Sequence, residues 1–221
     1  VTDGIDVTLH CENGMIGYGR IAHENEIDPE LVNAGSEPVT LQPGASFSDS
    51  ATAFGMIRGG HVNISVLGAY QVSEKGDLAN WQQPNRRVGS VGGSMDLVSG
   101  SKRVIVTMEH TTRDGKPRIV KKCTSPLTSR RCVHLIITSL AVIEVTPQGL
   151  LLREIAPGFT PEEVQQVTVE VHEHARVHFA LGVHVAALER VLGDEYVVTA
   201  AHLLHHRDDV GGLAGEDRRR G

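Results

Sequence analysis

The sequence has few aromatic residues, few cysteines and no long apolar run. Phe, Trp and Tyr make up 4% of the 221 residues, so Val, Ile, Leu and Ala must build the core. Cys11, Cys123 and Cys132 are odd in number and form no Cys-x-x-Cys pair. This argues against a disulfide framework and against a zinc site, and we expect no bound metal. Reduced thiols of this kind predict a cytoplasmic location.

A surplus of basic residues is also missing. The formal net charge is −6 with both signs interspersed, which predicts no binding to nucleic acid or to an anionic membrane surface. No apolar run approaches the roughly 18–20 residues of a membrane span, and we expect no signal peptide before the first strand. The length allows one substantial core, most simply one domain plus an extension.

The chain is organised around a short strand that runs into a sharp turn. Ile5, Val7 and Leu9 alternate with polar residues, which predicts a half-buried strand. Asn13-Gly14 then breaks the strand, because this pair supplies positive φ at low cost. Glu12 therefore lies at a strand end, where open α/β sheets bind ligands. On this local pattern alone, a solvated carboxylate in an ordinary hairpin turn is the simpler interpretation.

Helix and strand patterns alternate along the rest of the chain. Their order predicts an α/β layered sheet. Residues 103–108 are nearly continuous in apolar character, as in a buried parallel strand. The other predicted elements are a short helix start at 28–30, a loop or short strand over 41–47, a helix over 48–58, a strand over 61–70, a helix over 94–99, a hairpin over 140–155 and a helix that opens at 160–163.

The nine residues Leu9-His10-Cys11-Glu12-Asn13-Gly14-Met15-Ile16-Gly17 resemble the active-site signature of 3-oxoacid CoA-transferases, in their B subunit or equivalent C-terminal half. Eight of the nine positions match, and Cys11 stands where the family usually has Ser. The resemblance extends to about Val167 and is of the succinyl-CoA:3-ketoacid or 3-oxoadipate CoA-transferase type. It implies the fold of that family, an α/β protein with an open, largely parallel sheet and helices on both faces. Further matching blocks, in family order, are Pro43-Gly44-Ala45-Ser46-Phe47, Met56-Ile57-Arg58-Gly59-Gly60-His61, Gly76-Asp77-Leu78-Ala79-Asn80-Trp81, Met95-Asp96-Leu97-Val98 and Pro126-Leu127-Thr128.

The resemblance implies that Glu12 is the catalytic nucleophile and that Gly93, with Gly92 beside it, supplies backbone amides for the oxyanion and for CoA. Asn13 either orients Glu12 or serves only the turn. An ionised glutamate can attack a thioester without a general base. We therefore expect ping-pong transfer through a glutamyl-CoA thioester, with no cofactor and with coenzyme A as a substrate. Judged alone, Gly92-Gly93 also suits a plain flexible loop.

Other positions near the motifs carry weaker signals. Ser36 stands where relatives often have a Lys that approaches CoA, so CoA affinity or the identity of the contacting residue should differ here. Glu109-His110 at a strand end resembles an acid–base pair, but the expected mechanism needs no histidine. Phe54 and Met56 are interpreted as core residues rather than site residues.

The resemblance also implies a partner and substrates. An A-type subunit normally completes the CoA site, so a hetero-oligomer is expected, and the acid pair would be succinate with acetoacetate or with 3-oxoadipate. Family members carry a further strand end upstream, so the catalytic domain is expected to be incomplete at its N-terminus. Two alternatives stay open: a non-catalytic chain that only binds an A-type partner, and an acyl-CoA hydrolase.

The composition changes near the end of the resemblance. From Pro161 onward there is no Lys, Ile, Asn, Ser, Cys, Met or Trp, and seven of the 12 histidines lie there. We therefore divide the chain into a B-type catalytic domain over 1–167 and a His/Arg-rich tail over 168–221, which an altered reading frame or read-through would explain. Residues 177–185 alternate as a strand would. His172, His174 and His178 are interpreted as incidental rather than as metal ligands.

Overall fold

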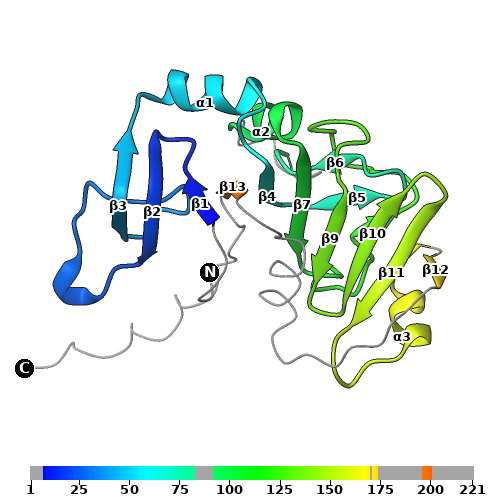
Figure 1. The fold of residues 1–221 in the computed structure, drawn as a ribbon. Helices are drawn as coiled ribbons and strands as arrows, with labels where there is room; N and C mark the ends of the chain where they lie inside the picture. The colour runs from blue at the N-terminus through cyan, green and yellow to red at the C-terminus, as the bar shows by residue number, and fades with distance from the viewer. Residues whose placement is uncertain (1–6, 83–91, 170, 174–195, 201–221) are drawn as a thin grey trace, which may run out of the picture.

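A computed structural model describes residues 7–82, 92–169, 171–173 and 196–200 (Figure 1). The strands form a ten-stranded sheet in the order β12-β11-β10-β9-β7-β4-β13-β1-β2-β3 and a three-stranded sheet in the order β6-β5-β8. The elements are β1 (Val7–His10), β2 (Met15–Ile21), the 3₁₀ helix η1 (Glu24–Glu26), β3 (Val39–Phe47), α1 (Ser50–Arg58), β4 (Ile64–Gly68), β5 (Gln71–Ser73), β6 (Leu78–Ala79), α2 (Ser94–Gly100), β7 (Arg103–Met108), β8 (Ile119–Val120), β9 (Leu135–Thr138), β10 (Ala141–Thr146), β11 (Gly149–Ile155), α3 (Pro161–Gln166), β12 (Val171–Glu173) and β13 (Tyr196–Ala200).

The α/β class and the open sheet are confirmed, with a mixed rather than a largely parallel pattern of pairing. Strands β1, β13, β4, β7 and β9 pair in parallel, whereas β2, β3 and β10 add antiparallel flanks. Short turns of the kind seen between β10 and β11 join antiparallel strands, and parallel pairs need a crossover such as α2 between β4 and β7. The carboxyl ends of the parallel strands consequently meet at one edge of the sheet.

Side chains of the central strands alternate between two faces of the large sheet. In β7, Val104 belongs to one apolar cluster and Ile105 to the other. Ile57 of α1, Leu97 of α2 and Val164 of α3 all lie in the cluster of Val104. The three described α-helices therefore all contribute to the core on the same face of the large sheet, whereas helices were predicted on both faces. Fully burying an aliphatic side chain of this kind contributes roughly 1.5–3 kcal/mol.

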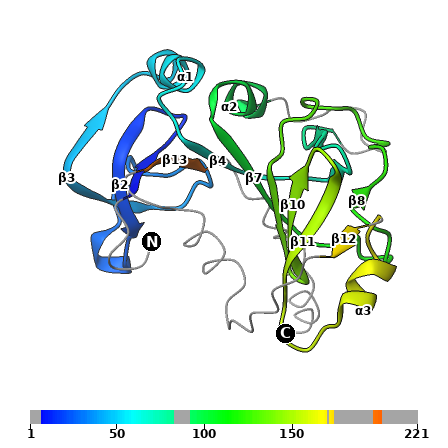
Figure 2. The ribbon, with the colours of Figure 1, turned by 45° about the vertical axis from the view of Figure 1, so that its right-hand side comes forward.

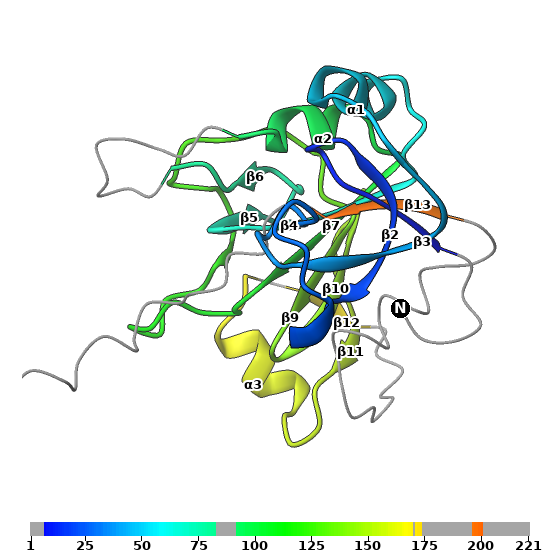
Figure 3. The ribbon, with the colours of Figure 1, turned by 90° about the vertical axis from the view of Figure 1, so that its left-hand side faces the viewer.

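Helix α1 begins two residues after its predicted start. The Asp49 side chain accepts a hydrogen bond from the Thr52 N–H at 2.7 Å, which caps the helix at its N-terminus. Helices α1 and α2 lie side by side in all three ribbon views (Figures 1, 2 and 3). A Cβ built on Gly100 would lie 1.9 Å from the Ile57 carbonyl oxygen, so only glycine allows this approach.

The helix predicted to open at 160–163 and the strand predicted over 61–70 are also confirmed. Thr160 and Glu163 form a reciprocal capping box at the start of α3. All five residues of β4 are buried. Its neighbours β7 and β13 flank it on both sides, so β4 is an interior strand of the sheet.

One prediction for the segment before α1 was wrong. No helix begins at residues 28–30; the short helix is η1, and a single turn with a hydrogen bond from the Leu31 N–H to the Asp28 carbonyl follows it. Residues 41–47, predicted as a loop or short strand, belong to strand β3. Pro43 is tolerated there because β3 is the edge strand of the sheet.

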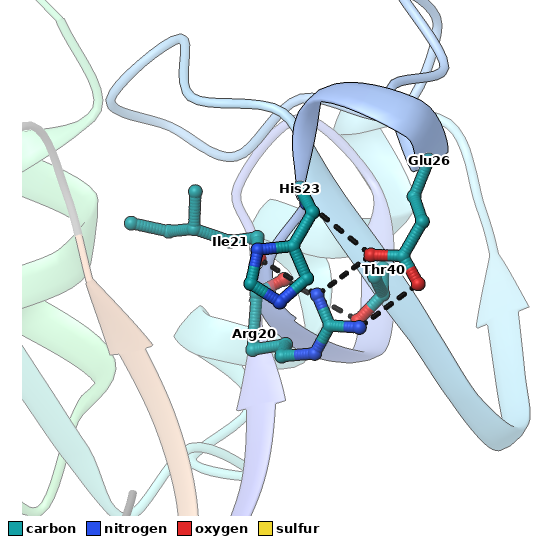
Figure 4. Close-up of polar contacts among 5 residues, drawn as sticks. All are labelled: Arg20, Ile21, His23, Glu26 and Thr40. Carbon is teal, nitrogen blue, oxygen red and sulfur yellow. Dashed lines mark hydrogen bonds and ion pairs between the residues drawn. The ribbon is translucent and has the colours of Figure 1, made fainter.

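The link between β2 and β3 is held by the polar contacts drawn in Figure 4. Arg20 pairs with Glu26 at 2.8 Å, and the same carboxylate accepts a hydrogen bond from the His23 backbone N–H. Arg20 also donates to the Ile21 carbonyl, and its own carbonyl accepts from the Thr40 hydroxyl. Because both charged groups are exposed, the ion pair shapes this link more than it stabilises the fold.

Two short strands come from the segment that the sequence assigned to the tail. β12 pairs with β11, and β13 lies between β1 and β4, parallel to both. Residues 177–185, His174 and His178, on which the strand and metal interpretations rest, lie outside the described residues. Among the residues that the structure describes, no helix has the length and apolarity of a membrane span.

Candidate active site

Glu12 lies in a tight turn at the carboxyl end of β1. The Gly14 N–H donates to the Cys11 carbonyl at 3.0 Å, and the Cys11 N–H donates to the Met15 carbonyl at 2.7 Å. Gly14 has φ +116°, and a Cβ there would lie 1.9 Å from the Ser48 carbonyl oxygen. The predicted turn is confirmed, and Gly14 alone supplies its positive φ.

The Glu12 carboxylate is half-buried. Its Oε2 atom is buried and has no hydrogen-bond partner among the described residues. Burial raises the pKa of Glu12 above its usual range, and the negative charge of Asp96 raises it further. A carboxylate held this way is more basic than a solvated one, which distinguishes it from an ordinary turn residue.

Gly93 lies directly against this carboxylate. It is the residue that precedes α2, and a Cβ built on it would lie 2.6 Å from Glu12 Oε2. Its φ of −69° and ψ of −3° are ordinary helical values, so glycine is needed here for space and not for an unusual backbone conformation. A Cβ on Gly92 would meet nothing within 4 Å. The structure therefore places Gly93 close to Glu12, whereas a side chain at position 92 would not reach the carboxylate.

Phe54 is a site residue that sequence reasoning assigned to the core alone. It does pack against the main apolar cluster, but its Cε1 and Cζ atoms also lie 2.6 Å from the ideal Cβ position of Gly93. The aromatic ring and the Glu12 carboxylate thus border the same small space. A helical pattern shows that Phe54 faces inward, but it does not show that Gly93 lies opposite.

Asp96 and Arg58 form the charged surroundings of the site. The Arg58 Nε atom donates to Asp96 Oδ1 at 2.7 Å, which joins the end of α1 to the first turn of α2. Phe54 belongs to α1 and Gly93 directly precedes α2, so this ion pair between the two helices helps to keep Phe54 next to Gly93. Sequence reasoning did not assign a role to either charged residue.

Asn13 and Ser36 lie in the backbone framework next to Glu12. The Asn13 side chain donates to the Val32 carbonyl at 3.0 Å, a contact that favours the role in turn conformation. Ser36 has φ 61°, inside a loop in which Asn33 Oδ1 accepts from the N–H groups of Gly35 and Glu37. Within the described part of the chain, neither Asn13 nor Ser36 forms a hydrogen bond with the Glu12 carboxylate.

His110 has a structural environment. Its Nδ1 atom is 2.8 Å from the Thr138 hydroxyl and its Nε2 atom 2.6 Å from the Thr168 hydroxyl, and the residue is 1% exposed. Burial lowers the pKa of His110 to about 4. Glu109 accepts a hydrogen bond from Ser139 instead of pairing with this ring. These contacts favour a packing role over an acid–base pair.

The described residues contain no cluster of three or more His, Cys, Asp or Glu side chains arranged to hold a metal ion. Cys11 is buried among Met15, Tyr18 and Val39, and burial raises its pKa. Its thiol is therefore protonated at neutral pH, so Cys11 is a poorer candidate for an anionic nucleophile than the neighbouring Glu12.

The fold and the site together define an α/β protein with a candidate active site, centred on a carboxylate, at the carboxyl edge of its sheet. The sequence model of the family described as Coenzyme A transferase matches residues 2–167. The chain is 48% identical over 170 residues to "Succinyl-CoA:3-ketoacid coenzyme A transferase 2, mitochondrial" of Homo sapiens, covering 76% of this chain and 33% of the relative. It is 46% identical over 168 residues to the B subunit of a probable succinyl-CoA:3-ketoacid coenzyme A transferase of Bacillus subtilis, covering 76% of this chain and 78% of the relative. The chain therefore belongs to the coenzyme A transferase family.

Solved structures show the same fold. An acyl-CoA transferase apoenzyme from Escherichia coli O157:H7 superposes with a TM-score of 0.60 at 19% identity, over 77% of this chain and 35% of that chain. A glutaconate coenzyme A-transferase from Acidaminococcus fermentans superposes with a TM-score of 0.55 at 17% identity, over 88% and 90%. The chain spans about a third of the human relative's length and about four fifths of the Bacillus subtilis relative's length.

Proposed function

We propose that this chain is the nucleophile-bearing, B-type part of a 3-oxoacid CoA-transferase. It would move CoA from a donor such as succinyl-CoA to a 3-oxo acid, acetoacetate or 3-oxoadipate. The observation that carries the proposal is the half-buried Glu12 carboxylate at the strand end, with Gly93 leaving space beside Oε2. The names of relatives 44–49% identical to this chain support the same reaction class.

The proposed reaction has two half-reactions that use the same atoms. A Glu12 carboxylate oxygen attacks the thioester carbonyl, the carbon–sulfur bond breaks, and CoA leaves as a thiolate from an acyl-glutamyl anhydride. The thiolate then attacks the Glu12 carbonyl carbon and expels the first acid as a carboxylate, which leaves a glutamyl-CoA thioester. The second acid runs both steps in reverse and regenerates the Glu12 carboxylate. No proton is transferred in any step.

The environment of Glu12 suits both steps. The raised pKa makes its carboxylate a stronger nucleophile than a solvated glutamate once it is ionised. Each tetrahedral intermediate carries an oxyanion, and backbone N–H donors at Gly93, with Gly92 beside it, are the proposed partners of that oxyanion. Phe54 would keep water away from the thioester carbonyl, which disfavours hydrolysis.

The proposal includes a partner and a location. An A-type subunit would complete the CoA site, and the names of bacterial relatives, which are described as B or β subunits, support this. No cofactor is needed, because coenzyme A enters as a substrate. Three cysteines without a disulfide frame support a cytoplasmic location, although the mammalian relatives are named as mitochondrial proteins.

An adduct assay tests the nucleophile. The chain, mixed with an A-type subunit, is incubated with succinyl-CoA or acetoacetyl-CoA and then reduced with borohydride, and the modified peptide is located by mass spectrometry. Reduction at Glu12 that requires acyl-CoA is expected. The variant Glu12→Gln keeps the size of the side chain and should show no modification, whereas Glu24→Gln in η1 should behave like the native chain.

The outcomes separate the proposal from its alternatives. An adduct at Glu12, together with acyl-CoA formed only when a carboxylate acceptor is present, supports transfer. An adduct accompanied by free acid and CoA without any acceptor identifies a hydrolase. Stable association with the A-type subunit, with no modification of Glu12, identifies a non-catalytic chain and refutes the proposal.

A further inference from the structure

A second concave region lies away from Glu12 and is lined by basic side chains. Two adjacent cavities, of about 530 and 310 Å³, share Lys75 and Arg131 as lining residues, and together they are called the basic groove here. The first is also lined by Glu74 and by residues 146–150. The second is also lined by Asp77, Lys122, Cys123, Leu127 and Arg130.

Most of the positive charges of the basic groove come from one basic stretch of the sequence, although the net charge of the whole chain is −6. Residues 116–131 contain six Lys and Arg residues and no Asp or Glu. Lys122, Arg130 and Arg131 of this run line the groove together with Lys75. Among the described residues, none of these four makes an ion pair. Within the described part of the chain, the cations of the groove are therefore not neutralised by an acidic partner.

The two acids of the groove do not cancel these charges. Asp77 Oδ1 accepts a hydrogen bond from the Arg131 backbone N–H at 3.1 Å and so holds the loop rather than the guanidinium. Burial raises the pKa of Cys123 to about 11, so its thiol adds no negative charge. Glu74 lies at one end of the groove, in the larger cavity only. Four cations and two carboxylates leave a net positive surface.

The backbone at Arg131 is held in an uncommon, left-handed conformation. Its φ is 50°, in the left-handed region that a non-glycine residue adopts at a cost of roughly 1 kcal/mol. Besides the Asp77 contact, the N–H groups of Cys132 and Val133 both donate to the Gly76 carbonyl and fix the loop in this conformation. Strain that the surrounding hydrogen bonds maintain is a mark of functional positions.

The basic groove is far from Glu12. The turn 146–149 joins β10 to β11, and β10 runs antiparallel to β9, so this turn lies at the edge where the parallel strands begin. Glu12 lies at the opposite edge, where they end. Five strand spacings of about 4.8 Å separate β1 from β10, roughly 24 Å across the sheet. Figures 1 and 2 show β1 and the β10–β11 hairpin on opposite sides of β4 and β7.

We propose that the basic groove binds a small ligand that carries a diphosphate group. Arginine and lysine side chains recognise phosphate oxygens through charge-assisted hydrogen bonds, and the four in this groove have no ion-pair partner among the described residues. The cavity volumes lie in the range of small-molecule sites, and a concave groove fits a small polyanion better than a flat protein surface. The source is either a free diphosphate or the diphosphate of a nucleotide, and both share this chemistry.

Titration calorimetry of the full chain tests the site, with inorganic pyrophosphate and ADP as separate probes at physiological salt. Arg131→Gly is the informative variant, because glycine accepts φ 50° while the guanidinium is removed, so the fold should be retained. Lys122→Ala is a second variant with an ordinary backbone. Lys116→Ala is the matched control: it lies in the same basic run, pairs with Asp114 at 2.6 Å, and lines neither cavity.

Saturable binding is expected, weakened about tenfold or more in Arg131→Gly and in Lys122→Ala, as the loss of one charge-assisted hydrogen bond predicts. Lys116→Ala and Glu12→Gln should bind like the native chain. Tighter binding of ADP would assign the site to a nucleotide, and equal binding would assign it to the free diphosphate. Absence of saturable binding, equal binding of citrate, or equal weakening by Lys116→Ala would overturn the proposal.

Discussion

Gly93→Ala is the substitution that tests the geometry of the active site most directly. The new methyl group would lie 2.6 Å from Glu12 Oε2, whereas ordinary contacts of a Cβ atom begin near 3.4 Å. The carboxylate must therefore move by about 0.8 Å or turn away. The backbone values of Gly93, φ −69° and ψ −3°, suit alanine. The effect should thus come from the displaced carboxylate and not from backbone strain.

The expected loss of activity follows from this displacement. A misplacement of about 1 Å costs on the order of 10²-fold in rate, which is about 2.7 kcal/mol of transition-state stabilisation. The methyl group also crowds the Phe54 ring, and overpacking of this kind costs about 1–3 kcal/mol of folding stability. The two effects need separate measurements: kcat/KM of CoA transfer with an A-type subunit, and urea unfolding of the chain.

Two further variants separate crowding from displacement. Gly92→Ala places its methyl group in open space, so it should leave both activity and stability unchanged. The double variant Gly93→Ala/Phe54→Leu relieves the crowded ring and should recover stability, but it leaves the carboxylate displaced and activity low. We assign to Gly93 the role of leaving space for the Glu12 carboxylate in its reactive position. Native activity in Gly93→Ala, or an equal loss of activity in Gly92→Ala, would refute this assignment.

Two other predictions concern charge. Asp96→Asn removes the negative charge that helps to raise the pKa of Glu12. Because Glu12 must be ionised to attack, the acid limb of the pH profile of kcat/KM should move to lower pH in this variant and stay in place in the control Asp114→Asn. An unmoved acid limb in Asp96→Asn would contradict the electrostatic coupling of Asp96 to Glu12. Burial lowers the pKa of His110 to about 4 in the folded chain. Between about pH 6.5 and pH 4, the His110 side chain is therefore protonated in the unfolded chain but neutral in the folded chain. This difference should lower the free energy of unfolding by about 2 kcal/mol from pH 7 to pH 5. Urea unfolding at both pH values should show a smaller difference in His110→Gln than in the native chain or in the exposed control His61→Gln, and equal differences in all three would refute this role.

Much of the local structure could be predicted from short stretches of the sequence. Gly14 after Asn13 marks the turn, Thr160 with Glu163 marks the start of α3, and the apolar run at 103–108 marks β7. The first two signals depend on backbone dihedral preferences and on hydrogen bonds within four residues, and the third depends on the apolar character of adjacent residues, so neighbouring residues alone carry all three. The nine-residue motif around Glu12 likewise identifies the candidate nucleophile from residues that are adjacent in the chain.

The active-site surroundings required contacts that no local pattern encodes. Phe54 reaches the space beside Gly93 because α1 packs on α2, and His110 finds hydroxyl partners 28 and 58 residues away along the chain. The antiparallel flanks of the sheet depend in the same way on strand pairing between distant segments.

The basic groove shows the same division. The sequence contains the run of six cations over residues 116–131, but only the tertiary structure brings three of them beside Lys75, and one of these three, Arg131, beside the turn 146–149. Sequence alone therefore determined the local elements, because short-range sterics and hydrogen bonding fix them, and its motif identified the candidate nucleophile. The packed chain decided which side chains surround that carboxylate and which cations share a groove, because such contacts form only when burial of distant apolar faces outweighs the chain entropy lost in joining them.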